Sequence, residues 1–294
     1  MGNYCVGCGD LRALFYSLIK NLQVFATREG INLAGRLATL IFSFSSTLYA
    51  GGLADTIEKI KPSIVGVGSY QPTRAPQSHL MGTGFVVADG YHVVTNAHVV
   101  AKNLAVEQNE KWVVFIGTGR QPKIREARII ARDEQHDLAI LRLTGTRLPP
   151  LSLDTTKPVR EGAEYAFTGF PIGAVLGLYP VTHHGIISSI TPVVIPPGSS
   201  RQLNATMIQR LRKPYNIFQL DATAYPGNSG SPLYRPDTGE VVGVINKVFV
   251  KQSKEAILAR PSGISYAIPA EYLEVLLSQL KTAAIPKSNQ VMGR

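Results

Sequence analysis

The chain has 294 residues, of which 45% are hydrophobic and 17% are charged, so it carries enough apolar mass for a folded core. This composition excludes a predominantly disordered chain, because such chains lack the apolar residues that offset chain entropy. The net charge is +10, but the cations are scattered, and we interpret them as a solubility feature rather than a nucleic-acid-binding stripe.

Residues 1–50 differ from the remainder and are interpreted as a signal peptide or membrane anchor. Residues 37–54 (LATLIFSFSSTLYAGGLA) contain no charge, and Arg28 and Arg36 precede them. The dense apolar part, residues 37–50, has the length of a secretory apolar region and is short for a membrane-spanning helix. We favour a cleaved signal and a periplasmic or secreted mature protein. An uncleaved anchor through residues 37–54 and a structured cytosolic segment are the alternatives.

Both cysteines of the chain, Cys5 and Cys8, lie in this N-terminal segment. A Cys-x-x-Cys pair can be half of a zinc site or a redox pair. The second half of a four-ligand site is missing, so a structural zinc site is not supported. If residues 1–50 are removed, the mature chain has no cysteine and its stability owes nothing to disulfides.

The hydrophobic pattern after residue 51 predicts one short helix followed by a series of strands. Leu53, Ile57 and Ile60 share a helical face, and Pro62 ends the predicted helix over residues 53–60. From residue 63 the period changes to two, and Asp89-Gly90 between two apolar runs predicts a hairpin turn. The predicted strands cover residues 63–70, 82–88, 92–96, 112–117, 123–131 and 137–143.

A linker is predicted over residues 149–160, and a second series of strands follows it. Arg235–Gly239 (RPDTG) predicts a turn, because proline fixes φ and glycine supplies a positive φ. Leucines at helical spacing predict a closing helix over residues 269–281, before a polar tail over 283–294. Short strands without intervening helices predict an all-β protein with two antiparallel units, over about 61–160 and 161–268. The strands of the second unit cover residues 163–170, 181–190, 215–222, 231–234, 240–250 and 263–268.

Three short motifs supply the residue types of a nucleophilic hydrolase. His98 follows a strand in TNAHVV, Asp137 opens a strand in HDLAIL, and Ser229 lies in the glycine-rich loop PGNSGSP. Acyl transfer requires an activated hydroxyl, a base within hydrogen-bond reach and a carboxylate that orients the base. Each residue alone has a more ordinary interpretation, as a loop, solvated or turn residue. Their combination, in the order His, Asp, Ser, favours catalysis.

We therefore predict that Ser229 is the nucleophile, His98 the base and Asp137 its orienting partner. The backbone N–H groups of Gly227 and Ser229 are expected to form an oxyanion hole. Activity should rise with pH as His98 loses its proton. The residues expected to border the substrate pocket are small or uncharged, which favours a small or aliphatic side chain at P1; they are Thr223, Ala224 and Asn246.

These motifs together resemble the trypsin-like serine proteases of the chymotrypsin fold, and especially the HtrA/DegP-like branch. The residues that carry the resemblance are TNAHVV (95–100), DLAILRL (137–143) and GNSGSPL (227–233), within a match from about Leu53 to Leu280. The resemblance implies two perpendicular six-stranded β-barrels with the active site between them. It also implies cofactor-free catalysis by His98, Asp137 and Ser229 on polypeptide substrates, in extracytoplasmic quality control or processing.

Several features depart from that branch or are left without a role. Such proteases usually carry a PDZ domain after the protease, and only a short tail follows Leu280, so tethering of peptides by a PDZ domain is in doubt. No histidine occurs in residues 238–250, so the glutamate specificity of the related glutamyl endopeptidases is not supported. His183 and His184 should point to opposite faces of a strand, which argues against joint metal ligation. No role is assigned to His79, His92 and His136.

Other classes of function were weighed against the endopeptidase. An α/β-hydrolase esterase is rejected, because that class places its serine before the acid and the histidine. A non-catalytic chaperone or binding protein on a protease fold is the main alternative. An anion-binding module would use Arg210, Arg212 and Lys213. Residues 189–215 are interpreted as a solvated insertion rather than a regulatory or oligomer-contact loop, and a homo-oligomer is left open.

Overall fold

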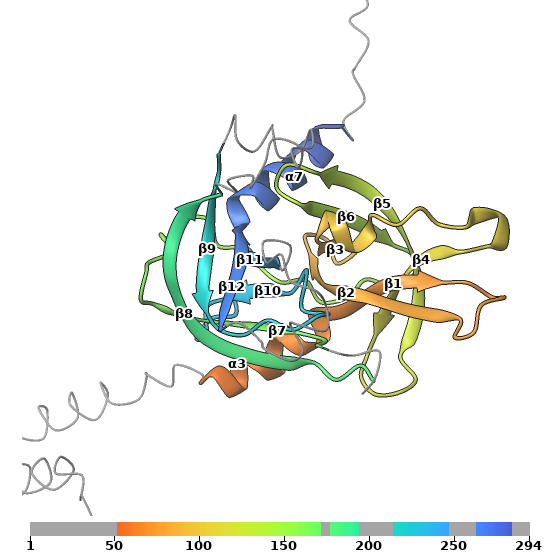
Figure 1. The fold of residues 1–294 in the computed structure, drawn as a ribbon, viewed down its shortest axis with the longest axis horizontal. Coiled ribbons are helices and arrows are strands. Elements are labelled where there is room, and N and C mark those ends of the chain that lie inside the picture. The colour runs from red at the N-terminus through yellow and green to blue at the C-terminus, as the bar shows by residue number, and fades with distance from the viewer. Residues whose placement is uncertain (1–51, 172–176, 194–213, 247–262, 284–294) are drawn as a thin grey trace, which may run out of the picture. The chain divides into compact units, whose positions relative to one another are not determined.

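The strand-like segments form two closed barrels of six antiparallel strands each, which lie beside one another (Figure 1). The computed structural model describes residues 52–171, 177–193, 214–246 and 263–283. The predictions for residues 1–50, including the signal or anchor and Cys5 and Cys8, lie outside these ranges. So do the cations Arg201, Arg210, Arg212 and Lys213, most of the predicted insertion over 189–215, and the tail over 284–294.

The first barrel has the strand order β1-β2-β3-β6-β5-β4 and closes between β4 and β1. The Asp89-Gly90 hairpin is confirmed, since Val87 pairs with His92 across it. β2 begins earlier than predicted, at Ser78, because Tyr70 at the end of β1 continues the pairing to that residue. The strands are β1 (Ile64–Tyr70), β2 (Ser78–Val87), β3 (His92–Thr95), β4 (Lys111–Ile116), β5 (Lys123–Asp133) and β6 (Leu138–Leu143).

The second barrel repeats this order as β7-β8-β9-β12-β11-β10 and closes between β7 and β10. The predicted RPDTG turn is confirmed: Gly239 N–H donates to the Arg235 carbonyl at 2.9 Å, and Gly239 has φ of 76°. The strands are β7 (Glu164–Gly169), β8 (Val181–Pro192), β9 (Asn216–Asp221), β10 (Pro232–Tyr234), β11 (Val241–Asn246) and β12 (Ile264–Pro269).

Some strands are buried on both faces, and their sequences are therefore nearly continuous runs of apolar residues. Val65, Val86 and Val93 fill the first barrel, whereas their neighbours Phe85 and Val94 point the other way. Those neighbours join one cluster with residues of the second barrel and of the C-terminal helix. Successive side chains along these strands point to opposite faces, so one face lines the barrel interior and the other contributes to the core between the barrels.

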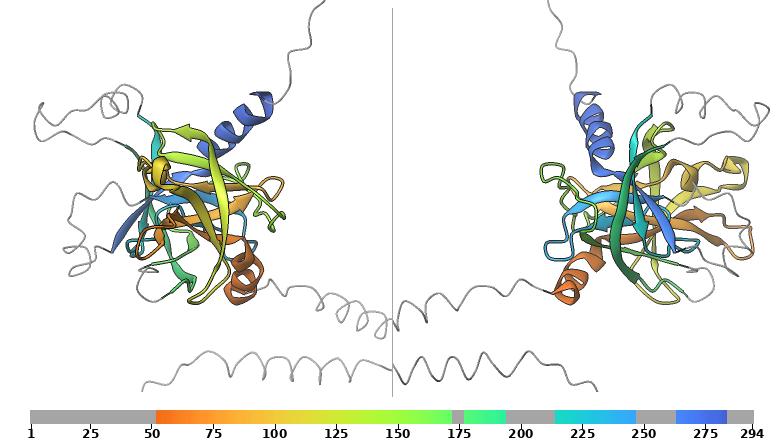
Figure 2. Two further views of the ribbon diagram at one scale, coloured as in Figure 1. Left: turned by 90° about the vertical axis from the view of Figure 1, so that its right-hand side faces the viewer. Right: turned by 60° about the vertical axis from the view of Figure 1, so that its left-hand side comes forward.

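Two helices lie at opposite ends of the molecule (Figure 2). α3 (Leu53–Ile60) packs on the RPDTG turn, where Thr56 Oγ1 donates to the Asp237 carbonyl at 3.3 Å. α7 (Ala270–Ala283) follows β12 and buries Leu273 and Leu276 in the inter-barrel core. Within the described ranges, no helix combines the length and apolar character needed to cross a bilayer.

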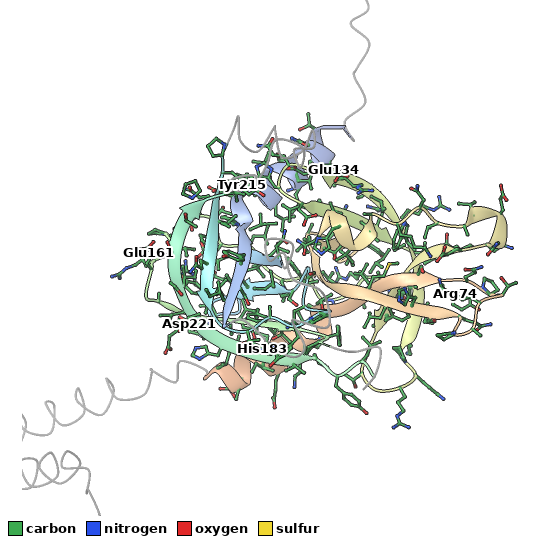
Figure 3. The ribbon with its side chains drawn as sticks, viewed as in Figure 1. Arg74, Glu134, Glu161, His183, Tyr215 and Asp221 are labelled. Carbon is green, nitrogen blue, oxygen red and sulfur yellow. The ribbon has the colours of Figure 1, made fainter. Side chains whose placement is uncertain are left out.

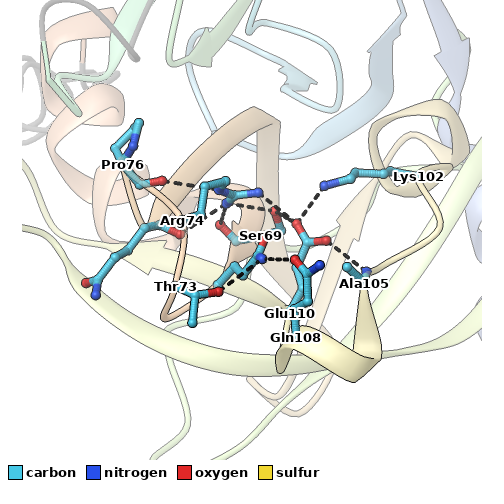
Figure 4. A network of polar contacts seen from close by, with 10 residues as sticks. Ser69, Thr73, Arg74, Pro76, Lys102, Ala105, Gln108 and Glu110 are labelled. Carbon is cyan, nitrogen blue, oxygen red and sulfur yellow. Dashed lines mark hydrogen bonds and ion pairs between the residues drawn. The ribbon is translucent and has the colours of Figure 1, made fainter.

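A buried carboxylate joins the loop after β1 to the loop before β4 (Figure 4). Glu110 is 3% exposed and accepts hydrogen bonds from Arg74, Lys102 and Ser69 at 2.7–2.8 Å. Burial alone would raise its pKa, but the Ala105 N–H and these side chains outweigh burial and lower the pKa to about 2. The carboxylate therefore remains charged and holds both loops in place.

Candidate active site

His98 and Asp137 meet at the end of the first barrel that faces the second. His98 lies in the 3₁₀ turn η2 (Ala97–Val100), directly after β3, and Asp137 precedes β6. The His98 Nδ1 atom lies 2.6 Å from Asp137 Oδ2, and the His98 N–H donates to Asp137 Oδ1 at 2.8 Å. Both carboxylate oxygens therefore fix this histidine, one through its ring and one through its backbone.

The backbone of Asp137 adopts a left-handed conformation with φ of 55°. This conformation is unfavourable for most residues but tolerated by aspartate. The Asp137 carbonyl accepts hydrogen bonds from Ala97 N–H and from Asn96 Nδ2, both at 3.1 Å. Both donors come from the TNAHVV motif, so the strand end that carries the histidine also holds the aspartate in this conformation.

Asn246 reaches the same carboxylate from the second barrel. Its Nδ2 donates to Asp137 Oδ2 at 2.8 Å, and the residue is 1% exposed at the end of β11. The sequence analysis placed Asn246 at the border of the substrate pocket. The structure directs the nitrogen of its side-chain amide to Asp137, and a contact of Asn246 with substrate stays a prediction.

Ser229 lies in a tight turn before β10 and is 6% exposed. Gly227 and Gly230 flank it with φ of 102° and 88°, values that favour glycine. A Cβ on Gly230 would lie 2.1 Å from the Thr83 carbonyl oxygen, so only glycine fits there. The glycines of the PGNSGSP motif thus serve the close approach of this turn to the first barrel.

Thr83 on β2 is the residue that the sequence analysis missed. Its N–H donates to the Ser229 carbonyl at 2.9 Å, and its Oγ1 donates to the Gly227 carbonyl at 2.7 Å. The same Oγ1 accepts a hydrogen bond from Phe170 N–H at 3.0 Å, and the residue is fully buried. The sequence analysis predicts a strand over residues 82–88 and assigns Thr83 no role. Nothing in its pattern shows that the threonine binds both ends of a turn far away in the chain.

The structure therefore brings His98 and Asp137 into direct contact, and Thr83 and Asn246 tie both barrels to the site. Among the described residues, no hydrogen bond joins Ser229 to the His98 ring. Catalytic hydrogen bonds are often long in unliganded structures and shorten only with substrate bound.

A family model for a trypsin-like peptidase domain matches residues 82–244, which span more than half of the chain and include His98, Asp137 and Ser229. The chain belongs to the trypsin-like peptidase family. The expected fold of two barrels is confirmed.

Curated relatives of the chain are HtrA- and DegP-like proteases. A probable periplasmic serine endoprotease from Halomonas elongata is 28% identical over 68% of this chain and 35% of its own length. The mitochondrial serine protease HTRA2 of Bos taurus is 34% identical over 76% of this chain and 42% of its own length. The chain thus spans less than half the length of these relatives.

A solved structure shares the fold. The HtrA-type protease AlgW with a tripeptide superposes with a TM-score of 0.56, at 24% identity over 79% of this chain and 64% of that one.

Two of the residues predicted to border the substrate pocket precede the serine and lie on one partly exposed stretch of the chain. Thr223 and Ala224 are both half-buried, and Ala224 N–H donates to Ser265 Oγ at 2.8 Å. Ser265 in turn donates to the Ala222 carbonyl at 2.6 Å, so β12 fixes the backbone of this stretch. Their contact with substrate stays a prediction.

The remaining histidines have separate partners. His92 Nδ1 lies 2.6 Å from Asp89, and His136 Nδ1 lies 2.5 Å from Asp133. His184 is exposed with Glu164 at 3.6 Å, whereas its neighbour His183 turns to the opposite face, as predicted. No cluster of three potential metal ligands occurs in the part of the chain that the structure describes.

Proposed function

We propose that the chain is a serine endopeptidase that cleaves polypeptides through an acyl-enzyme intermediate. Ser229 Oγ attacks the scissile carbonyl carbon while its proton passes to His98 Nε2. His98 then returns the proton to the leaving amine, and the acyl-enzyme forms. Water repeats the two steps and releases the acid with free Ser229.

The observation that carries this proposal is the contact between His98 and Asp137, at 2.6 Å. A carboxylate at Nδ1 fixes the tautomer in which Nε2 is free to accept a proton, and it stabilises the imidazolium that forms. The Asn246 amide donates a hydrogen bond that stabilises the charged form of the buried carboxylate and restricts its rotation. An ordinary His–Asp pair on the solvated surface would not need these additional contacts to its carboxylate.

The backbone of the serine turn favours an oxyanion hole. Asn228 N–H donates to the Tyr225 carbonyl and Gly230 N–H to the Ile245 carbonyl, at 3.0 and 2.9 Å. The N–H groups of Gly227 and Ser229, which alternate along the chain with those two, donate to no acceptor among the described residues. These are the two donors expected to stabilise the tetrahedral intermediate.

A fluorophosphonate probe tests the proposal directly, because it reacts with an activated serine. We expect the full chain to be labelled and Ser229→Ala and His98→Ala not to be labelled. Hydrolysis of an unfolded protein such as casein should follow the same order. Absence of labelling in the wild-type chain, with the fold intact by circular dichroism, would favour a non-catalytic binding protein.

We further propose small or aliphatic P1 preference and action outside the cytoplasm. Thr223 and Ala224 offer no charge to a P1 side chain, and the names of the two relatives described above place those proteins in the periplasm and in mitochondria. A peptide library scored for P1 tests the first point. Fusion of residues 1–60 to alkaline phosphatase, which is active only after export, tests the second.

A further inference from the structure

His183 lies on β8 with its ring packed against the core of the second barrel (Figure 3). The ring stacks on Phe167 with a centroid separation of 4.8 Å and an interplanar angle of 22°. The centroid of the Tyr225 ring lies 6.0 Å away, with the two rings tilted by 39°. Two aromatic neighbours therefore fix the plane of this half-buried imidazole.

The ring edge of His183 faces the residue that precedes the serine. Asn228 Nδ2 lies 3.4 Å from His183 Nε2, and Asn228 is fully buried. Asn228 Oδ1 has no hydrogen-bond partner among the described residues. His183 therefore provides the one side-chain hydrogen bond that this buried amide makes within the described part of the chain.

Asn228 also has little room to reorient. Its Oδ1 lies 2.9 Å from the position that a Cβ on Gly169 would occupy. Its backbone is engaged on both sides, by Tyr225 before it and Ser231 after it, at 3.0 Å each. A contact that fixes this side chain therefore also restrains the backbone of the Gly227–Ser229 turn.

The contact requires a neutral histidine. An amide nitrogen can only donate, so Nε2 must accept, and the ring proton must be on Nδ1. Burial lowers the pKa of His183, and among the described residues no charged group opposes this shift. The groups that face the ring are Phe167 from β7 and Tyr225 and Asn228 from the serine turn. The nearest strand neighbour, His184, faces the other side of β8 and pairs with Glu164.

We infer that His183 is a positioning residue for the proposed reaction: through Asn228 it holds the Gly227–Ser229 turn, and only its neutral ring can do so. This inference rests on the proposed function. Protonation of Nε2 places two donors against each other, which breaks the contact and loosens the turn. The enzyme then loses activity at acid pH through two protonations, that of His98 and that of His183.

The slope of the pH profile tests this inference in the full chain. We expect log(kcat/KM) of the wild type to fall with a slope greater than one over the acid pH range in which His183 becomes protonated. His183→Gln keeps an acceptor but cannot be protonated, so its slope should not exceed one and its activity at pH 8 should lie within about twofold of wild type. The matched control, His184→Gln, changes the neighbouring exposed histidine and should keep the steeper slope of the wild type.

His183→Phe removes the acceptor and keeps an aromatic ring. We expect kcat at pH 8 to fall about five- to tenfold, as expected for the loss of one neutral hydrogen bond, while KM changes less than twofold. Thermal unfolding of each variant separates misfolding from misplacement. A slope that never exceeds one in the wild type, or a slope in His183→Gln as steep as that of the wild type, overturns the inference.

The same variants distinguish this failure from failure of the proposed function. A wild-type chain that the fluorophosphonate probe labels, with an unaltered rate in His183→Phe, overturns only the role of His183. A folded wild-type chain that is labelled at no pH overturns the proposed function and the inference with it.

Discussion

Asp137 shows how much of the proposed chemistry depends on a single residue and the groups around it. Its carboxylate binds His98 through both oxygens and also accepts a hydrogen bond from Asn246. Its backbone adopts a left-handed conformation that Ala97 and Asn96 stabilise. Four of these five residues belong to the first barrel. Only Asn246 belongs to the second barrel, so among these residues it is the one through which the second barrel contacts the His98–Asp137 pair.

Asn246→Leu tests that coupling, because leucine has nearly the same volume and no donor. A hydrogen bond to a charged group is worth about 1.5–3 kcal/mol, so we expect kcat/KM to fall about ten- to a hundredfold. Asn246→Ser keeps a hydroxyl donor and should recover part of the loss. Unchanged kcat/KM in Asn246→Leu would show that His98 and Asp137 hold their arrangement without the second barrel.

Thr83 is a second residue whose role follows from its hydrogen bonds. Thr83→Val preserves shape but leaves Phe170 N–H without its acceptor and the Gly227 carbonyl without its donor. We expect the free energy of unfolding to fall by about 1–3 kcal/mol and probe labelling to slow, since the serine turn loses its support. Thr83→Ser retains the hydroxyl and should label at the wild-type rate. Equal labelling of both variants would contradict this role.

At the scale of elements, the loops at the outer end of the first barrel depend on Glu110. Three side chains and one backbone N–H from segments on either side converge on this buried carboxylate. Glu110→Gln leaves Arg74 and Lys102 without a counter-charge. Because breaking a buried ion pair is costly, we expect a loss of about 3 kcal/mol at pH 7 in urea unfolding, followed by fluorescence of the single tryptophan, Trp112.

The carboxylate of Glu110 also predicts that the stability of the protein depends on pH. The pKa of Glu110 falls from its ordinary 4.5 to about 2 on folding, so its contribution is complete above 4.5 and lost as the pH falls toward 2. The stability difference between the wild type and Glu110→Gln should therefore shrink between pH 5 and pH 2. Glu126→Gln serves as control, because its pair with Lys111 is exposed and should change stability little. A difference that stays constant with pH would argue against this ion pair.

At the scale of the whole molecule, the sequence predicted the architecture well because each strand lies between two turn signals. The helix over 53–60 and the strands in the described ranges were predicted within a few residues, whereas the last part of the strand predicted over 240–250 lies outside those ranges. Contacts between distant segments could not be predicted. Neither the link from Thr83 to Ser229 nor that from Asn246 to Asp137 has a local pattern, because each depends on how the two barrels pack.

The segment between the barrels shows the same limit. Residues 149–160 were predicted as a linker. In the structure, however, Leu151 N–H donates to the Val86 carbonyl in the first barrel, and Asp154 N–H donates to the Val241 carbonyl in the second. Asp154 is 6% exposed and forms an ion pair with Arg235 at 2.9 Å. The linker is therefore a bridging element that both barrels bind.

Asp154→Ala should reveal how much this bridge stabilises the molecule. Hydrogen bonds from Lys157 N–H, Thr156 and Arg235 outweigh burial and hold the pKa of Asp154 well below its ordinary value, so the carboxylate is charged at neutral pH. Its removal leaves the partly buried Arg235 with the Lys157 carbonyl but without a counter-charge, and we expect urea unfolding to show a loss of about 3 kcal/mol. Lys157→Ala removes an exposed pair with Glu240 on the same bridge and should cost less than about 1 kcal/mol. Equal losses in the two variants would mean that the charge of Asp154 does not anchor the bridge.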